Sequence, residues 1–274
     1  MRVIQNRMAL FWSIVLTILI LAAIFAPLVA PHDPLEQSAA LLEAPSRTYP
    51  FGTDELGRDV LSRIIYGGRI SLTVGLIAVA IAASFGTLLG LMAGFMGGFL
   101  DSTLMRIIDI MLAFPGIILA ILIMGTLGSS IVNVMIAVGI GAIPWYARTV
   151  RGSTLVVKQY DFVLAARAGG ASSSRLMLRH VLPNVLAPVI VLGTVGIAGA
   201  ILAISSLSFL GLGAQPPSPE WGSMLSQSRI YITRAWWITT FPGLAIMVSV
   251  LAINIIGDAL RDALDPRLRG AIKE

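Results

Sequence analysis

The sequence VRGSTLVVKQYDFVLAARAGGASSSRLMLRHVLPN occupies residues 150–184 and separates two apolar halves of the chain. Five of its residues are Arg or Lys, whereas Asp161 is its only acidic residue. The stretch is polar, lies between long apolar runs and is too short to form a domain of its own. We therefore expect it to bind a partner protein on its side of a membrane.

The composition of the 274-residue chain is that of an integral membrane protein. Hydrophobic residues make up 57% of it, charged residues make up 12%, and the mean hydropathy is +0.89. A soluble domain has about 45–50% apolar and about 25% charged residues. The formal net charge of +5 does not indicate nucleic-acid binding, because basic residues in a membrane protein usually set its orientation.

Chemistry that depends on thiols, metal ions or bound nucleotides is not expected. The chain has no cysteine, so it has no disulfide, thiolate nucleophile or Cys-ligated metal. Its two histidines, His32 and His180, are far apart in the sequence and predict no metal site. The sequence also lacks a nucleophile elbow, an HExxH motif, a dinucleotide fingerprint and a GxxxxGK[ST] phosphate loop. We therefore expect a protein that is not an enzyme and binds no cofactor itself.

A membrane-spanning helix needs about 20 predominantly apolar residues, and six segments approach or exceed this length. We predict an all-α protein with one transmembrane domain, residues 1–274, whose spans are 8–30, 70–95, 104–127, 131–146, 185–210 and 238–256. The first span follows Arg2 and Arg7, a pattern that a cleaved signal peptide also shows. It is longer than the apolar part of such a peptide and more spans follow, which favours a retained anchor.

Two long connections, residues 31–69 and 211–237, contain prolines that exclude a continuous spanning helix. In the first connection, Thr53 is a candidate N-cap for a short helix with one apolar face. The residues on this face are Leu56, Val60, Leu61, Ile64 and Ile65. We expect this helix to lie along the membrane surface.

Small and charged residues within the spans predict particular helix contacts. Gly86, Gly90 and Gly94 recur every four residues, a pattern that lets a second helix approach closely. Arg106 and Asp109 are three residues apart near the start of the third span, so we expect them to pair on one helix face.

Two amides, Asn133 and Asn254, are candidates for lining a transport pathway, although such residues more often form hydrogen bonds between helices. A proton-coupled transporter normally carries acidic residues deep in the membrane, and none stands out here.

The distribution of basic residues predicts the orientation. Six spans place both termini on the same side, and the positive-inside rule identifies that side. With the N-terminus inside, the cytoplasmic segments carry 13 of the 19 Lys and Arg residues, while acidic residues slightly outnumber basic ones outside. We therefore expect cytoplasmic termini, a cytoplasmic loop at 150–184, and extracytoplasmic loops at 31–69 and 211–237, in a bacterial inner membrane.

The 150–184 loop has a readable internal pattern. Residues 161–168 are a plausible short helix, and Gly169–Gly170 ends it with a left-handed turn. Ser172 can cap a second helix over residues 175–182, and Pro183 should then break the backbone before the fifth span. Two short helices at a glycine corner would form a rigid projection below the membrane. A solvated basic loop is the alternative on pattern alone.

Residues 160–184 resemble the EAA motif of bacterial ABC importer permeases, the loop that docks into the ATPase subunit. The residues that match this motif are Ala165, Ala166, Gly170, Leu182 and Pro183. The leading Glu of the motif is replaced here by Leu164, which removes any ionic contact that the Glu would make.

Three further stretches resemble the peptide/nickel importer branch, in particular its second, C-type permease subunit. They are FGTDELGRDVLSR at 51–63, SFLGLGAQPPSPEWG at 208–222 and GDALRDALDPR at 257–267. The four motifs lie between residues 51 and 267, so the resemblance covers nearly the whole chain.

The resemblance implies the type I ABC importer permease fold and a set of partners. A homologous second permease subunit would complete the pathway in the lipid bilayer, and two ATPase subunits would bind ATP and Mg²⁺ below it. An extracytoplasmic solute-binding protein would deliver the substrate. The residues expected to dock on the ATPase are Tyr160, Leu164, Ala165, Ala166, Gly169, Gly170, Ser172, His180, Leu182, Pro183 and Asn184.

The substrate and two rival functions stay open at this point. Relatives of this branch carry dipeptides, oligopeptides, glutathione or nickel complexes, and the lack of a metal-ligand cluster here favours peptides. A self-sufficient secondary transporter or channel would show an inverted repeat or buried coupling residues, and neither is visible. A membrane scaffold or receptor without transport activity is the other alternative.

Overall fold

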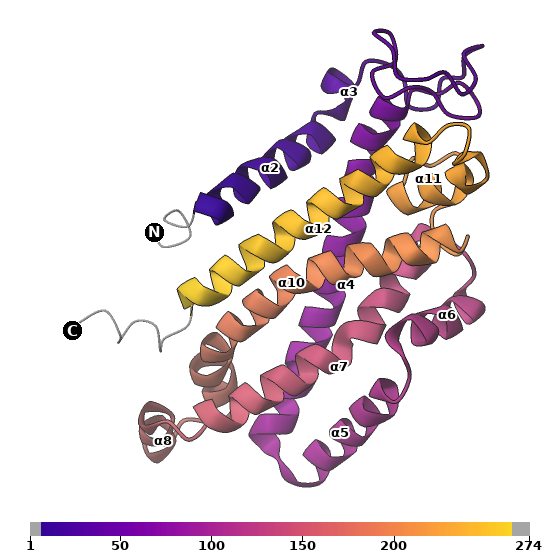
Figure 1. Cartoon of the computed structure of the whole chain (residues 1–274). Helices are drawn as coiled ribbons and strands as arrows, with labels where there is room; N and C mark the ends of the chain where they lie inside the picture. Colours follow the sequence, from indigo (N-terminus) through magenta and orange to yellow (C-terminus); the bar gives the residue numbers. More distant parts are fainter. Residues whose placement is uncertain (1–6, 265–274) are drawn as a thin grey trace.

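A computed structural model describes residues 7–264 of the chain (Figure 1), and the regular structure in this range is helical. The helices are α2 (Arg7–Ile24), α3 (Ala26–Val29), α4 (Val60–Met96), α5 (Gly98–Leu112), α6 (Gly116–Leu127), α7 (Ile131–Val157), α8 (Asp161–Ala168), α9 (Ser173–Arg175), the π-helical segment η1 (Leu176–Val181), α10 (Leu182–Phe209), α11 (Trp221–Ser228), the 3₁₀ turn η2 (Arg229–Tyr231) and α12 (Trp237–Leu264).

Within residues 7–264, five helices are long and apolar enough to cross a membrane. They are α2, α4, α7, α12 and the continuous helical stretch Ser173–Phe209 that includes α10. The pair α5 and α6 becomes a sixth span if it is counted as one broken helix, because the two axes are bent by 94°. The expected all-α, polytopic membrane fold is confirmed.

The expectation of one continuous helix over 104–127 is wrong. Pro115 follows the end of α5 and precedes α6 with a ψ of 132°, outside the helical region. Proline has no backbone N–H, and it also disfavours helical geometry at the preceding residue, here Phe114. The chain therefore changes direction at Pro115, and α5 and α6 are two separate short helices.

The expected surface helix after Thr53 is also wrong. The side chain of Asp59 caps α4 by accepting a hydrogen bond from the Ser62 backbone N–H at 2.9 Å. The helix then continues for 37 residues to Met96, beyond both ends of the predicted span 70–95. Gly67 and Gly68 do not interrupt it, because Trp221 packs over both of them.

The predicted glycine ridge is confirmed as the contact between α4 and α7. A methyl group added at Gly86 would overlap Tyr146, and one added at Gly90 would overlap the carbonyl oxygen of Ala147. One added at Gly94 would lie 2.8 Å from Cβ of Thr154. The absence of side chains every four residues lets the two backbones approach closely along most of their length.

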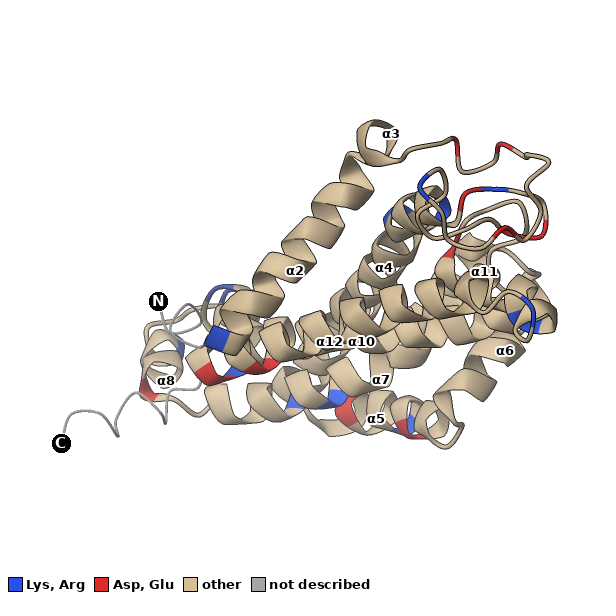
Figure 2. Cartoon of the chain, turned by 45° about the horizontal axis from the view of Figure 1, so that its top comes forward, with Lys and Arg blue, Asp and Glu red and all other residues tan. Residues whose placement is uncertain are grey.

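The long helices place two groups of elements at opposite ends of the molecule. Figure 1 shows α8 at the same end as the first turn of α2 and the last turn of α12, while residues 31–59 and α11 lie at the other end. The long helices pack against one another between these ends, with small residues such as Ala78, Ala82 and Ala137 buried in their contacts. Figure 2 shows that charged residues lie mainly toward the two ends, with a further group along α5 and α7.

Candidate functional site

Helix α8 ends in a glycine corner that follows from its sequence. Its bounds, Asp161–Ala168, are those predicted. Gly170 adopts a φ of +82°, and its N–H donates to the Arg167 carbonyl at 3.0 Å. The N–H of Ala171 donates to the Ala166 carbonyl at 3.1 Å. These two hydrogen bonds form a Schellman motif, in which glycine takes the left-handed position without steric cost.

The second half of the loop differs from the prediction. Ser172 is an N-cap, as expected, and accepts a hydrogen bond from the Arg175 N–H at 3.4 Å. The helix it starts does not stop at Pro183, because α9, η1 and α10 are continuous. Pro183 lacks the N–H that would bond to the Arg179 carbonyl, and the backbone just upstream is wound as a π-helix.

The amide of Asn184 donates to the His180 carbonyl at 2.7 Å. This bond reinforces the junction between η1 and α10, where the usual helical hydrogen-bond pattern is altered. His180 and Leu182 are half-buried, while Pro183 and Asn184 are exposed.

Helix α8 presents apolar side chains to the outside rather than burying them. Tyr160, Phe162 and Leu164 are 47%, 43% and 46% exposed, and the rings of Tyr160 and Phe162 lie 5.9 Å apart. We use the name α8 face for the whole exposed surface on and beside α8 that is formed by these three residues together with exposed Arg167 and Arg175. Aromatic and arginine side chains dominate the energetics of protein–protein interfaces.

The α8 face is held rigidly on the bundle. Val163, between Phe162 and Leu164 in the sequence, is fully buried in the same apolar cluster as Val181 and Leu176 from η1. Lys158, at the end of α7, donates to the Gly94 carbonyl at the end of α4 at 2.7 Å. Movement of α8 therefore requires movement of the helices on which it is packed.

A second feature is an apolar cavity of about 430 Å³ bordered by α4, α6, α7 and α10. Small residues such as Gly141, Gly199 and Ala203 leave this space open. Tyr146 contributes its hydroxyl group, which donates to the Leu192 carbonyl at 3.3 Å.

The two asparagines proposed for the pathway lie elsewhere. The Asn133 amide donates to the carbonyls of Leu127 and Gly128, at 2.7 and 3.0 Å, and so closes the turn between α6 and α7. Asn254 lies on α12 and borders an open apolar groove with residues of α10 and α12. Neither residue borders the cavity that contains Tyr146.

Charged side chains connect α5 and α7, in a pattern that differs from the sequence prediction. Asp109 pairs with Arg148 of α7 at 2.5 Å rather than with Arg106. Asp101 accepts two hydrogen bonds from Arg151, at 2.6 and 2.7 Å. The predicted pair between Arg106 and Asp109 is wrong because Asp109 faces α7, where a cation is already in reach.

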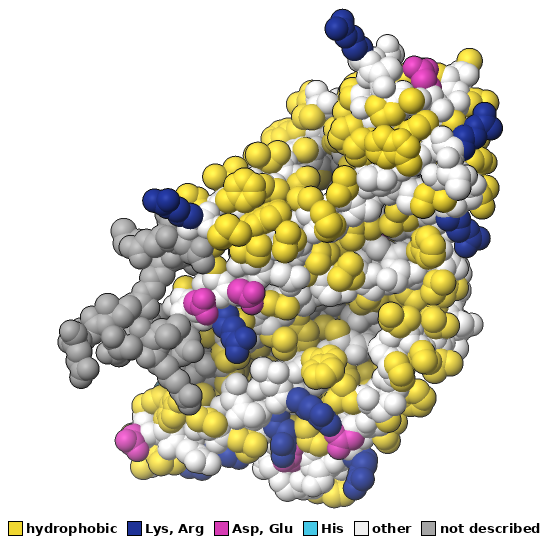
Figure 3. Space-filling model, in the orientation of Figure 1, with side chains coloured by type: hydrophobic (Ala, Val, Ile, Leu, Met, Phe, Trp, Pro, Cys, Tyr) yellow, Lys and Arg dark blue, Asp and Glu magenta, His cyan; other side chains and the backbone are white. Residues whose placement is uncertain are grey.

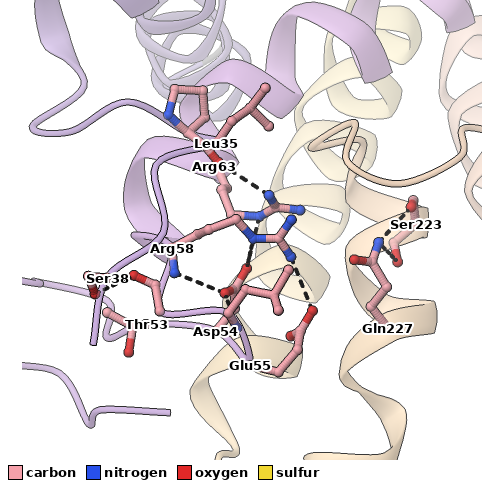
Figure 4. Close-up of polar contacts among 12 residues, drawn as sticks. Leu35, Ser38, Thr53, Asp54, Glu55, Arg58, Arg63, Ser223 and Gln227 are labelled. Carbon is pink, nitrogen blue, oxygen red and sulfur yellow. Dashed lines mark hydrogen bonds and ion pairs between the residues drawn. The ribbon is translucent and has the colours of Figure 1, made fainter. Parts of the chain in front are cut away.

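At the opposite end, buried charges fix residues 31–59 to the helices (Figure 4). Asp54 accepts a hydrogen bond from Nε of Arg58 at 2.7 Å, and Nε of Arg63 lies 3.4 Å from the same carboxylate. Arg58 also reaches Glu55 at 3.1 Å. The arginine side chains are 2–3% exposed. A buried cation is strongly destabilising without an acidic partner, so these ion pairs are required for the two arginines to stay buried. We call these four residues the outer cluster.

Two tryptophans add hydrogen bonds at the same end: Trp237 joins residues 31–59 to α12, and Trp221 joins α11 to α4. Nε1 of Trp237 donates to the Thr53 carbonyl at 3.0 Å, and Nε1 of Trp221 donates to the Ile64 carbonyl at 3.0 Å. Glu220 is fully buried and caps α11 by accepting hydrogen bonds from the N–H groups of Gly222 and Ser223, at 2.9 and 2.8 Å. The outer end is therefore a closely bonded cap.

Comparison with known proteins identifies the family. Residues 86–270 match the family described as the inner membrane component of binding-protein-dependent transport systems. The chain belongs to this family. Residues 1–45 of this permease match the N-terminal transmembrane domain of oligopeptide transport permease C.

Curated relatives cover nearly the whole permease. The di/tripeptide transport system permease protein DppC of Pseudomonas aeruginosa is 47% identical over 97% of this chain and 90% of its own length. The dipeptide permease DppC of Alkalihalophilus pseudofirmus and the glutathione permease GsiD of Escherichia coli O157:H7 are each 48% identical, over 97% of this chain and 88% of their own lengths. The resemblance to the peptide branch of ABC importer permeases is confirmed.

A solved structure shares the fold of the permease. The inward-facing MetNI methionine ABC transporter matches with a TM-score of 0.54 and 20% identity, over 71% of this chain and 94% of the other. This similarity supports the type I importer permease fold.

Sequence reasoning located α8 and its glycine corner but missed three parts of the permease. The cavity around Tyr146 is formed by helices that are distant in the sequence. Its glycine and alanine residues are the only feature of the sequence that indicates open space there. The outer cluster lies within the 51–63 motif, whose residue pattern does not by itself indicate buried ion pairs. The α5–α7 ion pairs join residues 39 and 50 positions apart, so local spacing rules do not reveal them.

Proposed function

We propose that the chain forms half of the translocation pathway of an ATP-driven ABC importer for dipeptides, oligopeptides or a related small solute. The family membership supports the permease role, and the names of the relatives support the substrate class. The single observation that carries the mechanism is the α8 face, a rigid projection with exposed Tyr160, Phe162 and Leu164 beyond the ends of the long helices.

The α8 face has the composition of a docking surface for an ATPase subunit. Because its apolar side chains are exposed, they contribute little to the stability of the isolated chain. Its arginines have no ion-pair partner among residues 7–264. A groove on an ATPase that received α8 would bury both kinds of side chain at once. ATP and Mg²⁺ belong to that partner, since the permease sequence has no phosphate-binding loop.

The basic residues at the α8 end also support the proposed orientation of the permease in the membrane. The basic residues of the 150–184 loop lie at the α8 end together with Arg7, and the positive-inside rule assigns such an end to the cytoplasm. The outer cluster and α11 would then face the extracytoplasmic binding protein. A homologous permease subunit would supply the other half of the pathway in the inner membrane.

The cavity around Tyr146 is a candidate for part of the wall of the pathway. Its lining is apolar, with no charged side chain, so it would offer little resistance to the varied side chains of small peptides. Glutathione or a nickel complex is the alternative cargo, and no group of three metal-binding side chains is found in residues 7–264. Competition between labelled dipeptide, glutathione and a nickel complex, measured with the reconstituted importer and its binding protein, decides among them.

The docking proposal is tested by changing the glycine corner. Gly170→Val places a β-branched residue at a φ of +82°, where even a simple side chain costs about 1–2 kcal/mol. We expect uptake and ATPase binding to fall by about 5–30-fold while membrane insertion persists. The control is Gly152→Val on α7, where no atom lies within 4 Å of an added Cβ.

Normal uptake by Gly170→Val would contradict the docking role of α8. Transport by the purified chain alone in liposomes, driven by an ion gradient, would instead favour a secondary transporter. Solute uptake that is unaffected by deletion of the gene would favour a scaffold or receptor.

A further inference from the structure

Helix α5 is held less firmly than the helices around it. It begins after Gly97, and both Gly97 and Gly98 have positive φ angles, of 69° and 58°, with open space around them. It ends at the 94° bend before α6. Ile108 is its only buried residue, and this side chain packs with Ile143 and Ala147 of α7. Helix α5 is therefore a short segment between two corners that packs against both α4 and α7.

Two ion pairs also hold α5 on α7. Arg151 contacts both carboxylate oxygens of Asp101, and Arg148 contacts Asp109 about two turns further along α5. Figure 3 shows basic and acidic side chains gathered at the lower edge of the molecule, where Figure 1 shows α5 and the neighbouring part of α7. A bidentate arginine–carboxylate pair, such as Arg151–Asp101, fixes orientation as well as distance. The single, more exposed contact between Arg148 and Asp109 adds a second point of attachment further along α5.

The same part of α7 leads directly into α8. Arg151 lies six residues before the end of α7 at Val157, and α8 begins four residues after that end. On the other side of the bend, Gly116, Ile117 and Ala120 of α6 border the Tyr146 cavity. A continuous series of contacts therefore joins the α8 face to the cavity wall through α7, the ion pairs, α5 and α6.

We propose that the Arg151–Asp101 and Arg148–Asp109 pairs are a mechanical link that passes movement of α8 through α5 to α6 and so to the cavity wall. This inference rests on the proposed docking of an ATPase at the α8 face. The four residues are positioning residues: they act on the pathway through α5 and contact neither ATP nor solute.

Charge reversal in the complete importer tests the link. In proteoliposomes, Asp101→Arg and Arg151→Asp should each lower solute uptake by about tenfold, within the 5–150-fold range of coupling between sites, while the ATPases remain bound and hydrolyse ATP. The double variant, which restores opposite charges, should recover most of the uptake. The informative quantity is the number of solutes transported per ATP hydrolysed, because a smaller amount of folded protein would lower both rates equally.

The matched control is Arg106→Asp, which reverses an exposed charge on α5 that has no ion-pair partner within residues 7–264. Uptake by this variant should stay within about twofold of the unaltered importer, as for most surface substitutions. Unchanged transport per ATP in both single reversals would overturn the proposal, and so would an assembled double variant that stays uncoupled.

A covalent replacement gives a second test that does not depend on reversed charges. The chain contains no cysteine, so Asp101→Cys with Arg151→Cys can be joined selectively by a short bismaleimide. Uptake should be low before crosslinking and should rise after it. Crosslinked protein that stays inactive would overturn the proposal, because it would show that α5 must move relative to α7. Loss of ATPase binding in Gly170→Val, by contrast, reports only on the docking site.

Discussion

Single glycines allow the close contact between α4 and α7 in the permease. The Gly90 backbone faces the carbonyl of Ala147 across the α4–α7 contact, and Gly86 and Gly94 face the same helix one turn away on either side. A side chain at Gly90 would meet backbone atoms, which cannot rotate away as a flexible side chain can. A side chain at this position would therefore force the two long helices apart, and the loss of their packing would destabilise the fold.

We predict that Gly90→Ala lowers the free energy of unfolding by about 1–3 kcal/mol, as for overpacked sites in cores. The matched control is Gly125→Ala in α6, where an added Cβ meets no atom within 4 Å. Because Ala is a better helix former than Gly, the control should be unchanged or slightly more stable. Thermal unfolding of both variants in detergent, followed by tryptophan fluorescence, gives the comparison. Equal stability of Gly90→Ala and the control would contradict the packing account.

Residues whose effect is local were predictable from the sequence. Gly170 stands where a helix must end, and Ser172 stands where the next must begin, so their roles follow from backbone geometry alone. Asp109 was not predictable in the same way. Its neighbour Arg106 satisfies the spacing for a pair within one helix, yet Arg148 of another helix is its partner. Choosing between the two requires the packing of α5 on α7.

At the scale of elements, the outer end depends on charge rather than on apolar packing alone. The outer cluster joins the segment 31–59 to the start of α4, and residues of α11 and α12, including Gln227 and Ile238, border it. Arg63 also donates to the Pro34 carbonyl at 3.2 Å. Because Arg58 and Arg63 are almost completely buried, the removal of their shared acid leaves Arg63 without an acidic partner and Arg58 with Glu55 alone.

We predict that Asp54→Ala lowers the free energy of unfolding by about 3–5 kcal/mol, the cost of breaking a buried ion pair from one side. Glu36→Ala is the control, since Glu36 is exposed in the same segment. Thermal unfolding should show the difference, and limited proteolysis should show faster cleavage within residues 31–59 of the Asp54 variant. Equal stability and equal cleavage of the two variants would show that the outer cluster does not hold this segment.

Elements differed in how far sequence could define them. The segment 161–168 was predicted to the residue because an acidic first turn and two glycines mark its ends. The bend at Pro115 had a local signal as well, but long apolar runs on both sides suggested a single span. The start of α4 at Val60 was missed because the polar residues 53–59 suggested a separate helix, whereas Asp59 caps the same helix that later crosses the membrane.

At the scale of the whole molecule, the permease is a bundle whose two ends differ in structure. The α8 end carries exposed aromatic and basic side chains on a rigid support, and the other end carries buried charges in a closely bonded cap. The apolar composition and the four family motifs were sufficient to predict this class of protein. The cavity and the contacts that join it to α8 needed the three-dimensional structure, because every one of them combines residues from separate helices.

The most direct test of the central claim is site-specific photocrosslinking in cells that contain the whole importer. A photoreactive amino acid at Leu164, in the α8 face, should capture an ATPase subunit. The same amino acid at Ile230, which is 72% exposed at the opposite end, should not capture it. Capture of the ATPase from position 230, or its absence at position 164 in an importer that still transports solute, would contradict the account.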